Sequence, residues 1–443
     1  MVQAGGKARQ PVLSPPAILC VRLYTSQQFM LFLALLLLIA LVVLLFTPIL
    51  PLRRRRAGVA NFPFVTLGLL AINSVIFFGN LSPTEGLVIS ERVVQSWGLM
   101  RGHLQFLPLI SYAFVHSDLF HLLGNMITLY VIGVHLEEAL GNLAYLVAYL
   151  AGALVAGLAH VLITNAFFPV AAPEESLIGA SGAIFAVLGL FAVRFWRTRV
   201  RLFGIPAVPA AIAVSIVMAL QIFLAIRSLV TPGADQVAYT AHLAGFFFGL
   251  GIAFPLRVLE QSAREYGIED AEAALAQGDL PTATRYYREL LVRTPTDGGL
   301  AHTLALVQLR LGDQEVAHRY FTEALDLFSK QGNAAAVARV YSDAQRNLLC
   351  VSLPVRLLQR VASACEDAQQ YELTRQALAN LCRDFPHTQD AELGMLKLGK
   401  LHLQKLHQRD NALAIFAEFL RLYPTSEWAN HVRGMITENQ NAS

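Results

Sequence analysis

Charged side chains are scarce in this chain. Asp, Glu, Lys and Arg make up 15% of its 443 residues, whereas 55% are hydrophobic. Soluble globular domains carry about 25% charged residues, so the composition indicates a protein that lies largely in a lipid bilayer. The formal net charge is only +3. Such a small charge excludes the strong positive field that nucleic-acid binding requires, and we expect no nucleic-acid partner.

Cysteine is also rare. Cys20 stands alone near the N-terminus, and Cys350, Cys365 and Cys382 are scattered in the C-terminal part without a Cys-x-x-Cys pair. This spacing indicates neither a disulfide framework nor a zinc site, and it fits a reducing compartment for the C-terminal part. We expect no metal and no other cofactor.

Long apolar runs are missing beyond about Arg257. Before that residue, seven runs have the length and composition of membrane-spanning helices. They are Phe29–Leu50, Phe64–Phe78, Ala113–Leu136, Leu143–Phe167, Ile178–Phe195, Ile205–Leu229 and Val237–Leu256. We therefore predict three regions: an N-terminal tail with one extra helix (1–57), a core of six transmembrane helices (58–258) and a soluble helical domain (259–443). The predicted fold class is all-α, a polytopic membrane helix bundle followed by a helical domain.

The arginines predict how the chain is oriented. The block Arg53–Arg56 follows the first run, and cytoplasmic loops are enriched in Arg and Lys. With Arg53–Arg56 inside, the other arginine clusters also fall inside: Arg194, Arg197, Arg199 and Arg201 in one loop, and Arg257 and Arg264 after the last run. The N-terminus is then outside and the C-terminal domain is cytoplasmic. We expect an integral, multi-pass protein of a bacterial inner membrane.

The C-terminal part contains a repeat. Gly278-Asp279 precedes Arg285-Tyr286-Tyr287, and 34 residues later Gly312-Asp313 precedes Arg319-Tyr320-Phe321. A helix–turn–helix period of 34 residues resembles tetratricopeptide repeats. The pattern returns weakly around Arg409 to Pro424, and the segment 335–385 keeps amphipathic character without the spacing. Such arrays bind peptides or helices, so we expect a cytoplasmic protein partner for this domain.

Polar residues within the apolar runs are the candidates for function, because each costs about 2.5–3.5 kcal/mol in a bilayer. Ser181 lies in Gly179-Ala180-Ser181-Gly182 at the start of a predicted helix. Glycine leaves the hydroxyl unobstructed, and a helix N-terminus favours developing negative charge. The alternative is a crossing of two helices, where small residues are common.

His242 is the second candidate. Gly245 and Gly249 follow it at a spacing of four residues, which gives a smooth stripe for close packing against another helix. If that partner is the helix that carries Gly182, the imidazole and the Ser181 hydroxyl come within reach as base and nucleophile. The alternative is a histidine that only hydrogen-bonds to a neighbouring helix.

His121 and Asn125 are spaced i, i+4 and share one helix face. Both can donate hydrogen bonds, as an oxyanion hole requires; the alternative is a pair of interhelical contacts. No acidic residue lies within an apolar run near His242, and Asp235 in the preceding loop is expected to be solvated. A Ser–His dyad therefore fits better than a triad.

Together, the serine motif, His-x-x-Gly-x-x-x-Gly two runs later and His-x-x-x-Asn two runs earlier resemble the rhomboid family of intramembrane serine proteases. The resemblance covers about residues 60–256 and includes Phe62-Pro63-Phe64-Val65-Thr66, Glu137 and Gly141. It implies that Ser181 attacks the scissile carbonyl, that His242 is the general base, and that His121 and Asn125 hold the oxyanion. It also implies substrates that are transmembrane proteins.

By the same resemblance, Phe185 stacks on the imidazole, and His116 has a structural role as a cap of the second core helix. Two other functions fit the sequence. One is an inactive relative that binds membrane clients, and the other is a membrane-anchored scaffold that acts through its repeats. A transporter fits less well, because no internal duplication with broken helices is present. The sequence names neither the substrate nor its cleavage site.

Overall fold

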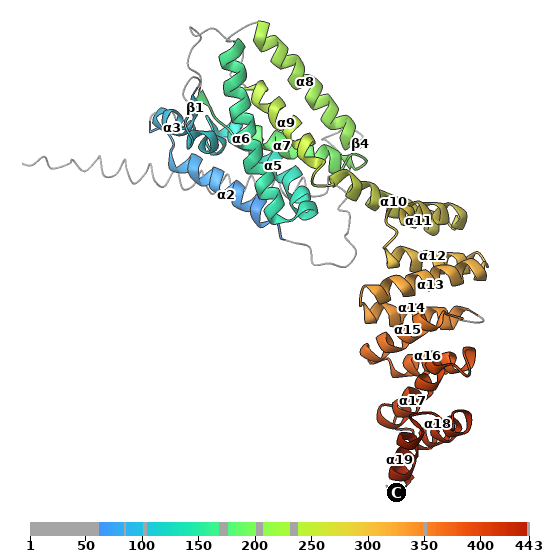
Figure 1. Cartoon of the computed structure of the whole chain (residues 1–443). Coiled ribbons are helices and arrows are strands. Elements are labelled where there is room, and N and C mark those ends of the chain that lie inside the picture. Colours follow the sequence, from blue (N-terminus) through green and yellow to red (C-terminus); the bar gives the residue numbers. More distant parts are fainter. Residues whose placement is uncertain are drawn as a thin grey trace, which may run out of the picture. The chain divides into compact units, whose positions relative to one another are not determined.

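The computed structural model describes residues 62–83, 86–100, 104–167, 176–200, 207–230, 238–348 and 352–440. The predicted helix at Phe29–Leu50, the block Arg53–Arg56 and Asp235 lie outside the described residues. The chain divides into two compact units between Ser262 and Ala263, and both are nearly all helical (Figure 1). The division predicted from the sequence was four residues earlier, after residue 258.

The first unit contains the apolar helices. Its helices are α2 (Phe64–Gly79), α3 (Glu91–Trp97), α4 (Pro108–Ser111), the 3-10 helix η1 (Tyr112–Phe114), α5 (Leu119–Leu140), α6 (Asn142–Phe167), α7 (Ser181–Arg194), α8 (Ala210–Val230) and α9 (Tyr239–Ala253). Two short antiparallel pairs accompany them. The strands β1 (Leu99–Met100) and β2 (Ser176–Leu177) pair with Leu99 opposite Leu177, and β3 (Arg199–Val200) and β4 (Val208–Pro209) pair with Arg199 opposite Pro209.

The membrane helices follow the predicted apolar runs. By length and composition, α5, α6 and α8 are each able to cross a membrane, and α9 with the following helix gives a fourth span if the bent pair is one; α2 and α7 are apolar but shorter. The largest difference from prediction is at α5, which begins at Leu119 and not at Ala113. The reason is local: η1 ends at Phe114, and the Asp118 carboxylate caps α5 by accepting hydrogen bonds from two backbone N–H groups.

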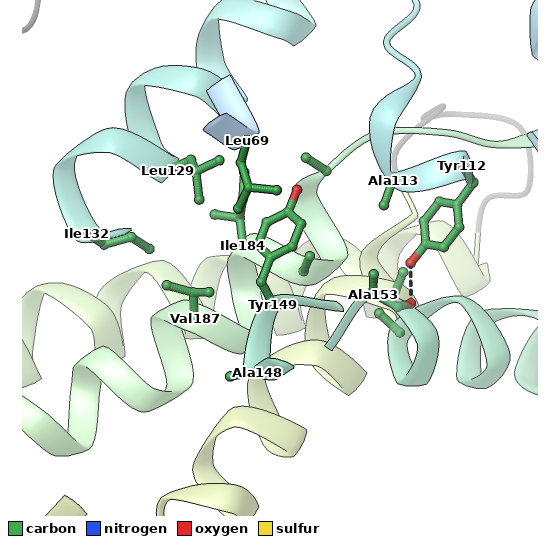
Figure 2. Close-up of a cluster of buried hydrophobic side chains, with 14 of the residues drawn as sticks. Leu69, Tyr112, Ala113, Leu129, Ile132, Ala148, Tyr149, Ala153, Ile184 and Val187 are labelled. Carbon is green, nitrogen blue, oxygen red and sulfur yellow. Dashed lines mark hydrogen bonds between the residues drawn. The ribbon is translucent and has the colours of Figure 1, made fainter. Parts of the chain in front are cut away.

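The core of the first unit lies between α2, α5, α6 and α7. Figure 2 shows part of this cluster, to which these helices contribute Leu69, Leu129, Tyr149 and Ile184. The Tyr112 hydroxyl donates a hydrogen bond of 2.6 Å to the carbonyl of Ala153 (Figure 2). This bond ties the segment before α5 to the middle of α6, and it satisfies a phenol that is buried away from water.

Glu137 of α5 is a buried carboxylate that hydrogen-bonds to the start of α2. It accepts hydrogen bonds from the backbone N–H groups of Val65 and Thr66 and from the Thr66 hydroxyl, at 2.7–2.9 Å. The first N–H groups of a helix have no partner within the helix. Glu137 satisfies two of them at the start of α2 and thereby joins α2 to α5.

Among the described helices, α7 and α9 make the most extensive contact, and they lie side by side (Figure 1). A Cβ atom at Gly245 would collide with the carbonyl oxygen of Gly182, and one at Gly249 would collide with that of Ala186. Backbone therefore meets backbone along this pair, as in other crossings of membrane helices through small residues. At the other end of α7, the Arg194 carbonyl accepts a 2.7 Å hydrogen bond from the buried Ser262 hydroxyl, which also accepts one from the Arg194 guanidinium at 3.3 Å.

The second unit is a helical array. Its helices are α10 (Val258–Ala276), which begins in the first unit, α11 (Leu280–Arg293), α12 (Gly298–Arg310), α13 (Gln314–Lys330), α14 (Ala334–Asn347), α15 (Val355–Asp367), α16 (Tyr371–Asp384), α17 (Gln389–Gln404), α18 (Arg409–Leu422) and α19 (Ala429–Gln440). Successive helices pack on one another in order along the unit (Figure 1). The tetratricopeptide-like organisation is present, and the helices α14–α16 continue it through the segment in which the spacing is lost.

The repeated Gly-Asp pairs form the turns between helices. Gly278 and Gly312 have φ of +78° and +82°, a conformation that favours glycine. The Asp279 and Asp313 side chains each accept a hydrogen bond from a backbone N–H in the first turn of the following helix. One residue pair therefore ends one helix and caps the next.

We predict that Asp313→Ala destabilises the second unit by about 1 kcal/mol, because α13 loses its N-cap. The reporter is the Cys365 thiol, which is fully buried in the hydrophobic cluster that also contains Phe321 of α13. Burial raises its pKa to about 12, so maleimide reacts only with opened molecules. Labelling resolved by mass spectrometry is expected to be about fivefold faster in the variant. Gln314→Ala, one residue further on, is the control; equal labelling of the two variants would contradict the prediction.

A second prediction concerns α9. Gly249→Ala is expected to destabilise the first unit by about 1–3 kcal/mol, because the added methyl group pushes against the backbone of α7. Gly251 lies on the same helix with open space around it, so Gly251→Ala is expected to stabilise the unit slightly, since alanine is the better helix former. Unfolding of the full chain in detergent measures both variants. Effects of the same sign and size would show that the close contact is unimportant.

Candidate active site

Ser181 is the first residue of α7. The turn before it is fixed by Gly179, whose φ of +115° favours glycine and whose N–H donates a 2.9 Å hydrogen bond to the Tyr112 carbonyl. Ala180 occupies the N-cap position without a side-chain cap. The N-terminal N–H groups of α7, including that of Ser181, therefore lie at the helix end that attracts negative charge.

His242 of α9 faces Ser181. Its Nε2 lies 2.7 Å from the Ser181 Oγ, a normal hydrogen-bond distance. The Phe185 ring, one turn after Ser181, stacks on the imidazole at 4.4 Å between centroids and 9° between planes. The contact of Gly182 with Gly245, described above, lies next to this pair. The structure thus brings together Ser181, His242 and Phe185 from helices that are far apart in sequence.

The other imidazole nitrogen has a partner that the sequence analysis missed. The His242 Nδ1 lies 2.9 Å from the Gln221 Oε1 on α8. Gln221 is not an acidic residue, and only an acidic residue was expected as a third member. The available signal was a carboxamide inside the apolar run 205–229, because polar side chains at membrane depth usually have a function.

His121 and Asn125 of α5 lie against the turn that precedes Ser181. A Cβ atom at Gly179 would be 2.7 Å from the His121 Nε2 and 3.6 Å from the Asn125 Nδ2, so only glycine fits there. The Asn125 Nδ2 is buried and has no hydrogen-bond partner among the described residues. A buried donor without an acceptor is costly, and this one lies close to the nucleophile.

His121 is held by two neighbours. The Ser117 hydroxyl lies 2.7 Å from the Asp118 carboxylate and 3.1 Å from the His121 Nδ1. A carboxylate only accepts, so the single hydroxyl hydrogen points to Asp118, and Ser117 must accept from an Nδ1–H of His121. Neutral His121 therefore presents a lone pair at Nε2, and only its imidazolium form donates there.

His116 does not cap α5, because that position is taken by the Asp118 side chain. The implied capping role of His116 is therefore wrong. Its ring is fully buried and packs edge-on against the His121 ring, with 5.1 Å between centroids. Through this edge-on contact, His116 helps to hold the His121 ring in place.

Two family models match parts of this chain. The family model of the rhomboid domain matches residues 103–258, and a tetratricopeptide-repeat model matches residues 394–426. Rhomboid-related protein 2 of Mus musculus is 32% identical over 149 residues, which cover 33% of this chain and 46% of that protein. Rhomboid protease GlpG of Yersinia pestis (strain Pestoides F) is 27% identical over 172 residues, which cover 38% and 56%.

A mitochondrial relative, RHOMBOID-like protein 12 of Arabidopsis thaliana, is 31% identical over 195 residues, covering 41% of this chain and 55% of the relative. The chain thus spans about half the length of the curated relatives it matches. Among solved structures, MamA 41-end from Desulfovibrio magneticus RS-1 matches 37% of this chain and 97% of its own at 18% identity and a TM-score of 0.16. The membrane unit of this chain resembles the rhomboid family, and its C-terminal helices resemble tetratricopeptide repeats.

Proposed function

We propose that this chain is an intramembrane serine endopeptidase that cleaves transmembrane segments of membrane proteins. The observation that carries the proposal is the 2.7 Å contact between the Ser181 Oγ and the His242 Nε2. A hydroxyl is a weak nucleophile until an adjacent base removes its proton. The resemblance to the rhomboid family supports a serine protease in kind, and one relative is named a rhomboid protease.

In the proposed reaction, the Ser181 Oγ attacks the carbonyl carbon of the scissile peptide while the His242 Nε2 takes the hydroxyl proton. The tetrahedral intermediate collapses when the imidazolium returns this proton to the leaving amine. Water then attacks the acyl carbon with His242 again as the base; the bond to the Ser181 Oγ breaks, the imidazolium returns the proton to this oxygen, and the peptide acid leaves. The stacked Phe185 ring keeps the imidazole plane fixed throughout.

The oxyanion that forms in both steps needs donors that are already in place. Asn125 supplies one, because its Nδ2 is buried without a partner beside the turn before Ser181. The backbone N–H of Ser181 at the start of α7 supplies another. His121 donates a third hydrogen bond only when it is protonated, since Ser117 takes its Nδ1–H.

The substrate class follows from the surroundings of the site. The chain is an integral membrane protein, and the candidate residues lie on apolar helices. A peptide bond in a substrate helix is shielded by its hydrogen bonds, so the substrate must unwind locally before attack. Water must also reach the site for deacylation, and the polar side chains of His121 and Asn125 beside the turn before Ser181 offer it hydrogen-bonding groups within the protein.

The proposed orientation follows from the arginines near the end of α7 and after α9. Arg194, Arg197 and Arg199 lie at one end of α7, and Arg257 follows α9. Under the positive-inside rule this end is cytoplasmic. Ser181, at the opposite end of α7, then lies toward the external side, and the helical array is cytoplasmic. We propose a bacterial inner membrane as the location.

A second candidate function concerns the array α10–α19. Its match to a tetratricopeptide-repeat model at residues 394–426 supports a role in binding a cytoplasmic protein. This role is compatible with proteolysis by the membrane unit. A protein-binding role of the array also fits a protein that binds membrane clients without cleaving them. The cleavage experiment below distinguishes such a client-binding protein from a protease.

Cleavage of a model transmembrane substrate in liposomes tests the proposal. Ser181→Ala and His242→Ala are each expected to lower kcat by roughly 10³-fold or more, because neither nucleophile nor base is replaceable. The control is Ser96→Ala, since Ser96 is an exposed serine on α3. A fluorophosphonate probe is expected to label the wild type and not Ser181→Ala. Equal cleavage by all four proteins, or cleavage by none, would favour a client-binding relative.

A further prediction concerns the oxyanion. Asn125→Ala is expected to lower kcat by about 10²–10³-fold with a smaller change in KM, because the lost hydrogen bond forms in the transition state. Thr128→Ala on the same helix is the control, since its exposed hydroxyl bonds only to the Gly124 carbonyl. An unchanged kcat in Asn125→Ala would remove this residue from the proposed mechanism.

A further inference from the structure

The imidazole of His242 has two hydrogen-bond partners among the described residues, and they lie on different helices. Ser181 of α7 contacts Nε2, and Gln221 of α8 contacts Nδ1. We propose that Gln221 is a positioning residue, which holds His242 in the one tautomer that makes it a base toward Ser181. This inference rests on the proposed function and adds a residue to its mechanism.

The tautomer follows from the chemistry of the partners. A neutral imidazole carries one N–H, on either Nδ1 or Nε2. At 2.9 Å, the Gln221 carbonyl oxygen is an acceptor, and an acceptor requires the hydrogen on Nδ1. Nε2 then carries a lone pair directed at the Ser181 hydroxyl, 2.7 Å away. Without the carbonyl of Gln221, the tautomer with Nε2–H is no longer disfavoured, and that form cannot take the proton of Ser181.

The other groups around the ring do not fix the tautomer. Phe185 stacks on one face, and Tyr239 approaches with its ring edge-on at 6.2 Å. The titratable groups that act on His242 electrostatically are His121 of α5 and His160 of α6. These are bases and provide no carboxylate partner for Nδ1. Gln221 thus occupies the place that an acidic residue has in a Ser–His–Asp triad, with a carbonyl in place of a carboxylate.

The sequence of α8 aims Gln221 at the site. Val214, Met218 and Ala225 are buried, and their spacing of three or four residues from one another and from Gln221 places all four on one helix face. Val214 and Met218 pack in one cluster with Phe246 of α9. Most of the other large side chains of α8, such as Phe223, are exposed, as expected of a lipid-facing surface. Gln221 is the amide in an otherwise apolar packing face, and an amide there is favourable only when it is hydrogen-bonded.

The experiment compares Gln221→Met and Gln221→Glu in the full chain. Methionine keeps the length of the side chain and removes the acceptor. Gln221→Met is therefore expected to lower kcat/KM about tenfold, because a partly buried hydrogen bond that selects the active form is lost. Fluorophosphonate labelling of Ser181 is expected to slow by a similar factor, and the melting temperature in detergent to stay near that of the wild type.

Glutamate keeps the acceptor oxygen and adds negative charge. Gln221→Glu is expected to recover most of the activity, with the acid limb of the kcat profile moved to higher pH. The sign follows because a nearby carboxylate stabilises the imidazolium, so a higher pH is needed to free Nε2. Ser215→Ala, at an exposed position of α8, is the control with unchanged kcat/KM and pH profile.

The outcomes separate this inference from the proposed function. If the wild type neither cleaves substrate nor reacts with the fluorophosphonate, the proposed function fails. If the wild type is active and Gln221→Met matches it in rate and pH profile, only the role of Gln221 fails. An equal loss of kcat/KM in Gln221→Met and Gln221→Glu, without a shift of the acid limb, would also overturn the role. Such a result would show that Gln221 acts only through packing.

Discussion

The direct backbone contact between α7 and α9 is the constraint on which the site depends. Gly245 lies against the carbonyl of Gly182, so no side chain separates the two helices. Ser181 immediately precedes one contact residue, and His242 lies less than one turn before the other. The distance between hydroxyl and imidazole is therefore set by helix packing, and little side-chain freedom must be lost to form the pair. Any change that separates these helices also separates the two candidate reactants.

Two carboxylates of the membrane unit have structural roles, whereas a buried amide group next to Ser181 has no hydrogen-bond partner among the described residues. The Glu137 carboxylate caps α2, and the Asp118 carboxylate caps α5 while it orients Ser117. Both carboxylates are satisfied by these hydrogen bonds, as an apolar solvent demands. The Asn125 Nδ2 is the exception next to Ser181, since it is buried without an acceptor. In the resting protein this unpaired donor raises the free energy of the folded state. A developing oxyanion would accept its hydrogen bond and remove that penalty.

Most of the fold could be predicted from the sequence, because bilayer thickness and apolar runs leave few choices for the helices. The meeting of Ser181 and His242 was also inferable, since both lie beside glycines that allow close packing. Gln221 was not found because a single amide in an apolar run has no partner at a recognisable spacing. Its role depends on the rotation of α8 against α9, a tertiary property. Likewise, the choice between His116 and Asp118 as the cap of α5 depends on where the helix begins to within two residues.

The pair of hydrogen bonds between Ser262 and Arg194 has a consequence for protein engineering. Arg194 is the last residue of α7, whose first residue is Ser181, and Ser262 lies in the second turn of α10. A cut after residue 258, where the composition changes, deletes a buried partner from the far end of the serine-bearing helix. A fusion that replaces the helical array with another module should therefore be joined downstream of Ser262. The first turns of α10 are then retained as part of the membrane unit.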